Sequence, residues 1–180
     1  MGDAEHKIMF AGPVGAGKTT AIGAISDIPV VSTEARATDA VAMRKSRTTV
    51  AMDYGHIVLD GGRKLHLYGT PGQERFRFMW DILATGSLGL VLLMDNARPD
   101  PLADLGFYLE AFKGSMTETA VVVGVTRTDM QPWPSLATYQ MWASARDLRI
   151  PILTVDARSR KDIATLLKVL LAMLDPSLRR

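Results

Sequence analysis

The sequence predicts a single α/β domain in which helices cover both faces of a mixed, six-stranded sheet. Short apolar runs alternate with helical patterns from end to end, which is typical of parallel strands joined by helices. Between two of these runs, Asp60-Gly61-Gly62 has the chemistry of a hairpin turn and predicts one antiparallel pair. The 180 residues suit one domain, so we expect a single unit over residues 1–180.

Each element is expected from its local pattern. The apolar runs predict strands at residues 7–10, about 49–59, 65–68, 88–94, 120–125 and 150–155. Apolar spacing and capping residues predict helices at residues 18 to about 25, 73–84, 101–113, 135–147 and 162–174. The last helix carries an apolar stripe that we expect to pack on the sheet: Ile163, Leu166, Leu167, Leu170, Leu171 and Leu174. Residues 27–47 lack clear periodicity, which predicts a functional loop.

Composition narrows the classes of function. The chain has 21 basic and 19 acidic residues, and a net charge of +2 is too small to indicate a nucleic-acid partner. It contains no cysteine, which excludes disulfides and thiolate catalysis. No apolar run approaches the ~18 residues of a membrane-spanning helix, and the N-terminal residues lack a signal-peptide pattern. We therefore expect a cytoplasmic protein with no integral membrane segment.

Residues 12–19, GPVGAGKT, match the phosphate-binding spacing G-x-x-x-x-G-K-[ST] at every fixed position. Such a loop turns backbone N–H groups toward phosphate oxygens at the positive end of a helix dipole, and here it follows a strand and opens a helix. Lys18 is expected to neutralise the β- and γ-phosphates, and Thr19 to bind Mg²⁺. The expected phosphate-binding residues are Val14, Gly15, Ala16, Gly17, Lys18, Thr19 and Thr20. The sequence thus predicts a site for a nucleoside triphosphate or diphosphate with Mg²⁺.

Residues 69–76, GTPGQERF, resemble the second switch of Ras-like small GTPases, D-x-x-G-Q-E. The resemblance implies that Gly72 presents its N–H to the γ-phosphate and that Gln73 orients the attacking water. A turn that caps the following helix is the alternative. Gly69 stands where the pattern has the Asp linked to Mg²⁺, so another group must replace that carboxylate. Asp53 is our candidate, although an exposed charge at a strand end fits it equally well.

The functional loop expected at residues 27–47 is the candidate for the first switch. The end of this loop and the residues directly after it supply two further site candidates. By analogy with Ras-like proteins, Thr49 is favoured over Thr48 as the threonine that touches Mg²⁺ in the triphosphate state. Arg47 lies next to them and is a candidate for an internal arginine finger, with a solvated loop arginine as the alternative. Val14 occupies a position that is glycine in many Ras-like proteins and is expected to crowd a finger from a partner. We therefore expect slow intrinsic turnover.

A base-reading segment follows the run at residues 120–125. Thr126-Arg127-Thr128-Asp129 stands where small GTPases have N-K-x-D, which implies that Asp129 accepts hydrogen bonds from guanine N1 and N2. Arg127 is expected to lay its stem against the purine face. Thr126 replaces the Asn and cannot supply both groups of an amide. Guanine is therefore favoured, while adenine stays open.

A second segment is expected to contact the base. Asp156, Ala157 and Arg158 stand where small GTPases have S-A-K, which implies that the Ala157 N–H contacts guanine O6. Asp156 departs from the Ser of that pattern.

Two segments together, Thr-Pro-Gly-Gln without a preceding Asp and residues 48–55, TTVAMDYG, are similar to the bacterial Ras-like GTPases of the MglA group and the related conservon ATP/GTP-binding proteins. The resemblance covers essentially the whole chain. It implies a P-loop NTPase fold of the Ras-like kind, a GTP/GDP switch with Mg²⁺, and a Roadblock-type (MglB-like) GTPase-activating partner. A P-loop phosphotransferase acting on a small metabolite is one alternative. A nucleotide-bound pseudo-GTPase scaffold, suggested by Gly69 and Thr126, is the other.

Overall fold

The computed structural model describes residues 6–36, 49–115 and 119–174, which form a mixed sheet with helices on both sides. The strands within these ranges are β1 (His6–Ala11), β2 (Val31–Arg36), β3 (Thr49–Val58), β4 (Lys64–Gly69), β5 (Gly89–Asp95), β6 (Ala120–Thr126) and β7 (Ile152–Thr154). The helices are α1 (Lys18–Ile25), α2 (Arg77–Ala84), α3 (Pro101–Phe112), α4 (Leu136–Ser144) and α5 (Arg160–Leu174). Two short 3-10 turns are η1 (Asp60–Gly62) and η2 (Glu74–Phe76).

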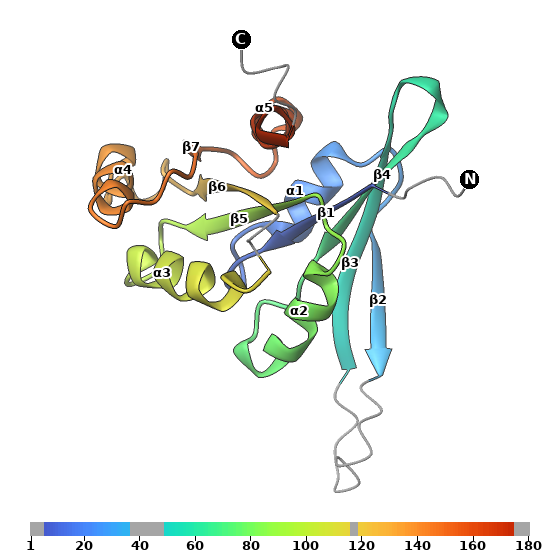
Figure 1. Cartoon of the computed structure of the whole chain (residues 1–180), viewed down its shortest axis with the longest axis horizontal. Helices are drawn as coiled ribbons and strands as arrows, with labels where there is room; N and C mark the ends of the chain where they lie inside the picture. Colours follow the sequence, from blue (N-terminus) through green and yellow to red (C-terminus); the bar gives the residue numbers. More distant parts are fainter. Residues whose placement is uncertain (1–5, 37–48, 116–118, 175–180) are drawn as a thin grey trace, which may run out of the picture.

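The sheet has the strand order β2-β3-β4-β1-β5-β6-β7 (Figure 1). Strands β4, β1, β5, β6 and β7 pair in parallel, so their carboxyl ends meet at one edge. Strands β2, β3 and β4 pair antiparallel, and this ribbon twists away from the rest of the sheet. The loop that follows β1 and the segments that follow β4, β5 and β6 therefore converge at the same edge, where α/β folds bind their ligands.

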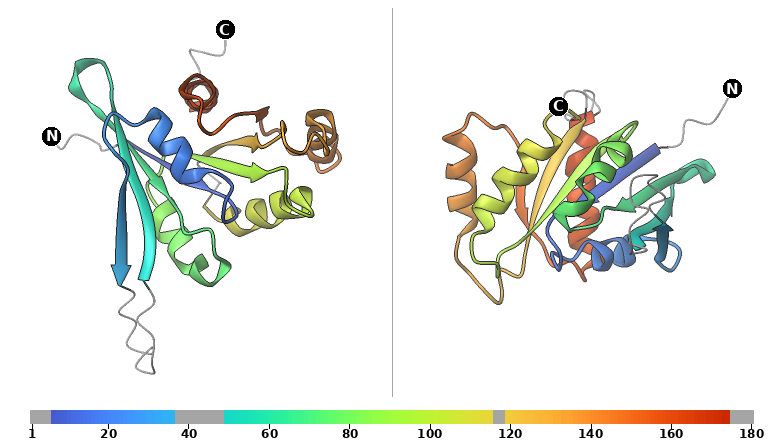
Figure 2. Two further views of the ribbon diagram at one scale, coloured as in Figure 1. Left: turned by 180° about the vertical axis from the view of Figure 1, so that it is seen from behind. Right: turned by 90° about the horizontal axis from the view of Figure 1, so that it is seen from below.

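Helices cover both faces of the sheet (Figure 2), and a hydrophobic cluster lies between the helices and the sheet on each face. Helices α1 and α5 pack on one face, and α2, α3 and α4 pack on the other. The central strands supply both layers by alternation: Ile8 of β1 packs with α1 and α5, whereas Met9 packs with α2 and α3. In the described part of the chain, none of the helices has the length and hydrophobicity that crossing a bilayer takes.

The predicted α/β fold, with a mixed sheet covered on both faces, is confirmed, but the number of strands is wrong. The sheet has seven strands instead of six, because residues 31–36 form an edge strand inside the segment expected to be a loop. Their sequence, VSTEAR, lacks an apolar pattern, since an edge strand is held mainly by backbone pairing to its neighbour. Two pairs are consequently antiparallel, where one was expected.

Three predicted helices differ from the structure by two or more residues at one end. The helix expected over residues 135–147 ends at Ser144. The segment expected to be one helix over residues 73–84 is divided into η2 and α2, since Phe76 at the junction leaves helical geometry. The final helix begins at Arg160, two residues before the expected start. Its apolar stripe packs on the sheet as predicted, with Ile163, Leu166, Leu167 and Leu170 buried.

Candidate functional site

The loop of residues 12–19 has a backbone that only glycine tolerates at its two ends. Gly12 has φ +143°, and a Cβ there would lie 2.1 Å from the carbonyl oxygen of Leu93 in β5. Gly17 has φ +99°, and a Cβ there would lie 2.8 Å from the Cβ of Ala157. The loop therefore packs against the end of β5 on one side and against the residues after β7 on the other.

Lys18 begins α1 and is buried inside the loop, with 8% of its surface exposed. Its Nζ donates hydrogen bonds to the carbonyl oxygens of Gly12 at 2.7 Å and of Pro13 at 2.8 Å. Burial lowers the pKa of Lys18 from 10.5 to about 8, and the nearby Asp53 carboxylate opposes this shift. The ammonium is thus held at the centre of the loop by backbone oxygens.

Asp53 of β3 faces the start of α1. The Thr19 hydroxyl donates to its Oδ2, and the Ser32 hydroxyl of β2 donates to its Oδ1 at 2.8 Å. Asp53 is paired in register with Gly69, where a Cβ would lie 3.1 Å from the Asp53 Cβ. A carboxylate thus stands on the strand next to Gly69, and the glycine leaves room for it.

The segment after β4 lies over the phosphate-binding loop. A Cβ on Gly72 would approach the Val14 nitrogen to 2.7 Å and Lys18 Nζ to 3.0 Å, so Gly72 rests directly on the loop. Gln73, the next residue, is exposed and precedes the short turn η2 as its N-cap residue. The structure therefore places Gly72 at the phosphate end of the site and Gln73 at the surface beside it.

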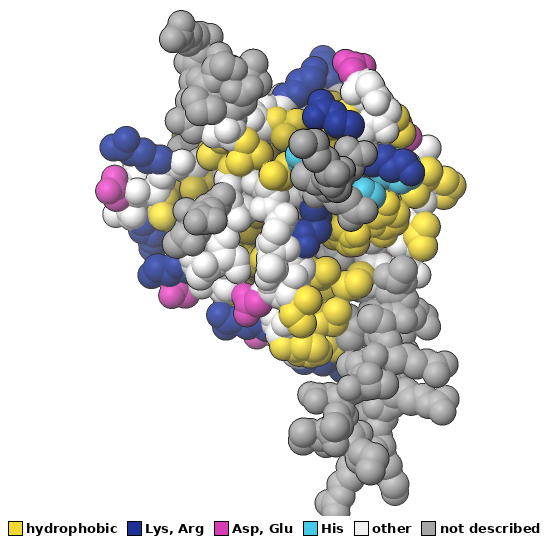
Figure 3. All heavy atoms as spheres, turned by 45° about the vertical axis from the view of Figure 1, so that its right-hand side comes forward, with side chains coloured by type: hydrophobic (Ala, Val, Ile, Leu, Met, Phe, Trp, Pro, Cys, Tyr) yellow, Lys and Arg dark blue, Asp and Glu magenta, His cyan; other side chains and the backbone are white. Residues whose placement is uncertain are grey.

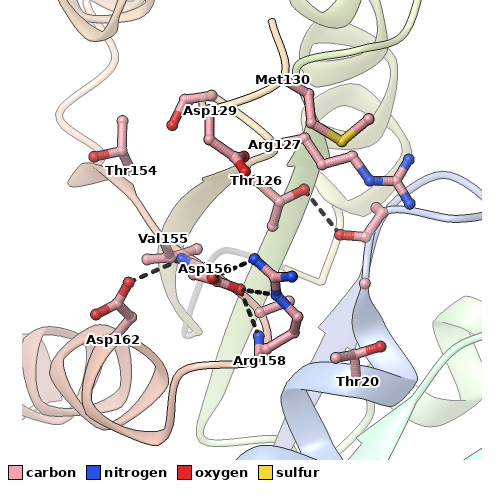
Figure 4. Close-up of a pocket in the computed structure, with 14 residues that line it drawn as sticks. Thr20, Thr126, Arg127, Asp129, Met130, Thr154, Val155, Asp156, Arg158 and Asp162 are labelled. Carbon is pink, nitrogen blue, oxygen red and sulfur yellow. Dashed lines mark hydrogen bonds and ion pairs between the residues drawn. The ribbon is translucent and has the colours of Figure 1, made fainter. Parts of the chain in front are cut away.

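A hollow of about 530 Å³ opens beside the loop (Figure 4). It is lined by Ala16, Gly17 and Thr20 of the loop and α1, by Thr126 to Met130 after β6, by Thr154 to Arg158 at the end of β7, and by Asp162. In Figure 4, Asp129 and Arg158 lie on opposite sides of the hollow, and Thr20 lies toward its phosphate-loop end. Three of the predicted phosphate-binding residues therefore line one space together with the predicted base-reading residues.

Thr126 connects the two parts of this space. Its buried hydroxyl lies 3.0 Å from the carbonyl oxygen of Ala16 and 3.2 Å from that of Met94. Arg127 has φ +58° and lines the hollow with its stem, while its guanidinium donates to the buried Asp95 carboxylate at 2.7 Å. The hydroxyl of Thr126 thus ties the segment after β6 to the phosphate loop, and Asp95 fixes the direction of Arg127.

Asp156 and its neighbours form the opposite wall. The Arg158 side chain makes two hydrogen bonds to the Asp156 carboxylate, at 2.9 and 2.8 Å, and the Arg158 backbone N–H donates to it as well. These contacts lower the pKa of Asp156. The Asp156 N–H donates to Asp162 Oδ2 at 2.9 Å, which fixes the turn that presents Ala157 to Gly17.

Sequence reasoning missed the residues that support the base-reading segment. Asn96 is fully buried, and its amide donates to the carbonyl oxygens of Gln131 at 2.6 Å and of Pro134 at 3.1 Å. The Tyr139 hydroxyl donates to Asn96 Oδ1 at 2.8 Å. The signal was present in the sequence, because the polar residue Asp95 ends a buried parallel strand and Asn96 follows it directly.

The side chains of two predicted site residues lie outside the described part of the chain. Arg47 lies outside the described residues. Thr49 is the first residue of β3, paired with Arg36 of β2, but its side chain is outside the description. Of the expected first switch, the structure describes β2, the start of β3 and the hydrogen bond from Ser32 to Asp53.

The fold and this site define a nucleotide-binding protein of the P-loop NTPase class. Residues 29–172 match the family described as "Conserved hypothetical ATP binding protein", and the chain belongs to this family. The matched residues begin after the loop of residues 12–19, so the loop is independent support for nucleotide binding.

Two proteins are similar to the chain. An uncharacterized protein of Methanocaldococcus jannaschii is 36% identical over 50 residues, which is 28% of this chain and 32% of that protein. The match thus spans about a third of the archaeal protein's length. Ras-related protein RABC2a of Arabidopsis thaliana is 25% identical over 167 residues, which is 89% of this chain and 73% of that protein. The second similarity is weak but extends over most of both chains.

Proposed function

We propose that the protein is a Ras-like GTPase of a single G domain that binds GTP, hydrolyses it slowly to GDP, and switches conformation between the two states. The observation that carries this proposal is the continuous hollow that joins Gly17 and Thr20 to Asp129. A base in this hollow would meet the Asp129 carboxylate, an acceptor that suits the N1–H and N2 amino group of guanine and offers adenine no donor. The similarity to a Ras-related protein agrees with this reading.

The residues at the phosphate end fit Mg²⁺. Thr19 and Asp53 offer only oxygen atoms, and nucleotide-bound Mg²⁺ takes one or two protein oxygens together with phosphates and waters. We propose that the Thr19 hydroxyl binds the ion and that Asp53 fixes a water on it, with Thr49 joining in the triphosphate state. Bound Mg²⁺ would neutralise charge on the phosphates during hydrolysis.

The other roles in phosphate binding and hydrolysis would fall to side chains and backbone groups of the protein. Lys18 would exchange its bonds to Gly12 and Pro13 for bonds to phosphate oxygens, and the Gly72 N–H would contact the γ-phosphate. Gln73 would orient the attacking water, and Arg47 is proposed as the internal arginine finger. These roles require the segment after β4 to move away from the loop, which is the proposed switch.

A GTPase-activating partner of the Roadblock type belongs to the same proposal. Its basis is the resemblance of residues 48–55 and 70–73 to the MglA group, together with an apolar surface on α2. On the face shown in Figure 3, hydrophobic side chains gather over this helix, where Phe78 is 56% exposed and Ile82 67% exposed. A helix that follows the switch and exposes apolar side chains suits a partner that responds to the nucleotide state. A cytoplasmic location agrees with such a role.

The test compares base recognition in wild type and Asp129→Asn. Wild type should bind mant-GDP with Mg²⁺ at least ~100-fold more tightly than mant-ADP. Asp129→Asn should lose most of the affinity for GDP and gain affinity for xanthosine diphosphate, because an amide donor matches the xanthine O2 acceptor. Asp147→Asn makes the same chemical change outside the hollow and should behave as wild type.

Preference for ADP, or an Asp129→Asn variant that binds GDP as wild type does, would refute the guanine assignment. Single-turnover phosphate release then separates the alternatives. Release of phosphate to water supports the GTPase. A nucleotide that stays intact indicates a scaffold, and transfer to a small-molecule acceptor indicates a phosphotransferase.

A further inference from the structure

Two buried aromatic side chains hold the segment after β4 by its backbone carbonyls. The Trp80 indole of α2 donates to the carbonyl oxygen of Pro71 at 2.9 Å, and the Tyr108 hydroxyl of α3 donates to that of Gly72 at 3.2 Å. The two rings stack on each other, with centroids 5.0 Å apart and an interplanar angle of 26°. Trp80 and Tyr108 are 1% and 3% exposed, so these donors are fixed by the core.

These bonds hold Gly72 in the space above Lys18. A Cβ on Gly72 would lie 3.0 Å from Lys18 Nζ, which puts the Gly72 α-carbon within roughly 4.5 Å of the ammonium. A phosphate oxygen bound by that ammonium would lie about 2.8 Å from it, with its phosphorus farther out. Gly72 and a γ-phosphate on Lys18 therefore compete for one volume. In the same conformation the ammonium is occupied by Gly12 and Pro13.

We propose that Trp80 and Tyr108 are positioning residues that set the preference of the site for diphosphate over triphosphate, by holding Pro71 and Gly72 closed on the phosphate loop. This inference rests on the function proposed above. The two donors stabilise the closed segment, and a triphosphate requires it to open. Their hydrogen bonds therefore lower the affinity for triphosphate relative to diphosphate. The size of this effect equals the free energy by which these bonds stabilise the closed conformation over the open one.

Tyr108 is suited to this role at every physiological pH. Burial raises the pKa of its phenol, so the hydroxyl keeps its proton and remains a donor. Trp80 has a single donor that never titrates in this range. The closed segment is thus held by two neutral groups and not by a charge that salt or pH would weaken.

Tyr108→Phe tests the proposal because it removes one hydroxyl and keeps the ring stack. The affinities of wild type and variant for GDP and for the slowly hydrolysed analogue GTPγS are measured by displacement of mant-GDP in the presence of Mg²⁺. Loss of one hydrogen bond to the closed segment should shift the GTPγS-to-GDP affinity ratio about fivefold toward GTPγS. A general loss of stability would weaken both affinities and leave their ratio unchanged, so the ratio separates positioning from folding.

Tyr139→Phe is the matched control. It also removes a buried tyrosine hydroxyl, but that hydroxyl donates to Asn96 in the base-reading part of the site. It should change the affinities for both nucleotides alike. If wild type binds guanine nucleotide and Tyr108→Phe has the same GTPγS-to-GDP affinity ratio as wild type, the positioning role alone is overturned. Failure of wild type to bind either guanine nucleotide would overturn the proposed function with it.

Discussion

Asp53 of β3 and Gly69 of β4 stand opposite each other in the antiparallel register, and the carboxylate of Asp53 reaches Thr19 across the space that Gly69 leaves open. Ras-like proteins carry their Mg²⁺-linked carboxylate at the position of Gly69. In this chain the glycine stands on β4 and a carboxylate stands on β3. A side chain at residue 69 would press on Asp53 and on Ile22. The two positions therefore depend on each other.

Moving the carboxylate back to β4 tests this dependence. Asp53→Gly should raise the release rate of mant-GDP in Mg²⁺ about tenfold, because the ion loses a charge-assisted contact. Combining it with Gly69→Asp should restore part of the slow release, since paired residues of neighbouring strands lie about 5 Å apart and the new carboxylate faces the same helix. Gly69→Asp alone should be destabilised by crowding and by two adjacent carboxylates.

The control for this swap is the same measurement in excess EDTA. Without Mg²⁺, wild type and Asp53→Gly should release nucleotide at similar rates. An Asp53→Gly variant that retains nucleotide in Mg²⁺ as well as wild type does would assign Asp53 a purely structural part in holding Ser32 and Thr19.

Lys18 is expected to lower the stability of the nucleotide-free protein at neutral pH. Its pKa falls from 10.5 to about 8 on burial, so the folded state holds this proton less tightly than the unfolded state. Lys18→Met removes that penalty, which at about 1.4 kcal/mol per pKa unit is roughly 3 kcal/mol at pH 7. The loss of the hydrogen bonds to Gly12 and Pro13, at about 1 kcal/mol each, offsets part of this gain, so the nucleotide-free variant should be more stable by about 1 kcal/mol. The same variant should no longer bind nucleotide.

The sign of the pH dependence identifies the cause. Below pH 8 Lys18 is protonated in both states, and its penalty is complete. Between pH 8 and 10.5 the unfolded state binds more protons than the folded state. The free energy of unfolding of wild type therefore rises relative to that of Lys18→Met as the pH rises. Urea unfolding of both proteins at pH 7 and pH 10 measures the difference, with the exposed Lys168→Met as control. A Lys18→Met protein less stable than wild type at pH 7 would contradict the prediction.

The parallel half of the sheet and the phosphate loop could be predicted from the sequence because each has a strong local signal. Buried parallel strands read as apolar runs, and the glycine and lysine positions of residues 12–19 have one spacing that serves phosphate binding. The edge strand β2 could not be predicted, since backbone pairing to β3 holds it and its sequence has no apolar pattern.

The supporting contacts of the site were inaccessible to sequence for a different reason. Asn96 and Tyr139 lie 43 positions apart, and Tyr108 and Gly72 lie 36 apart, so only the packed fold brings them together. The sequence makes Asp53 a candidate because it lies four residues after Thr49, the threonine expected in the first switch. Its contact with Thr19 depends on the register of β3 against β4, which no local pattern specifies.

Thr126→Val tests the bond between the base-reading segment and the phosphate loop. Valine has nearly the same shape but leaves the Ala16 carbonyl without its hydroxyl partner in a buried position. We expect a loss of about 1–2 kcal/mol in the free energy of unfolding and a roughly fivefold lower affinity for GDP. Thr126→Ser keeps the hydroxyl and should retain the affinity of wild type. Equal affinities of the Val and Ser variants would show that the bond does not couple the two segments.

Gln73→Leu should separate hydrolysis from binding. The Gln73 side chain is exposed beside Gly72 at the phosphate end of the site, so its removal should leave the affinity for GDP and GTPγS within about twofold of wild type. If the side chain orients the attacking water, single-turnover phosphate release should slow by between about tenfold and a hundredfold. Glu74→Leu alters the neighbouring exposed residue and should hydrolyse GTP as wild type does. Equal turnover in Gln73→Leu and wild type would show that the Gln73 side chain takes no part in hydrolysis.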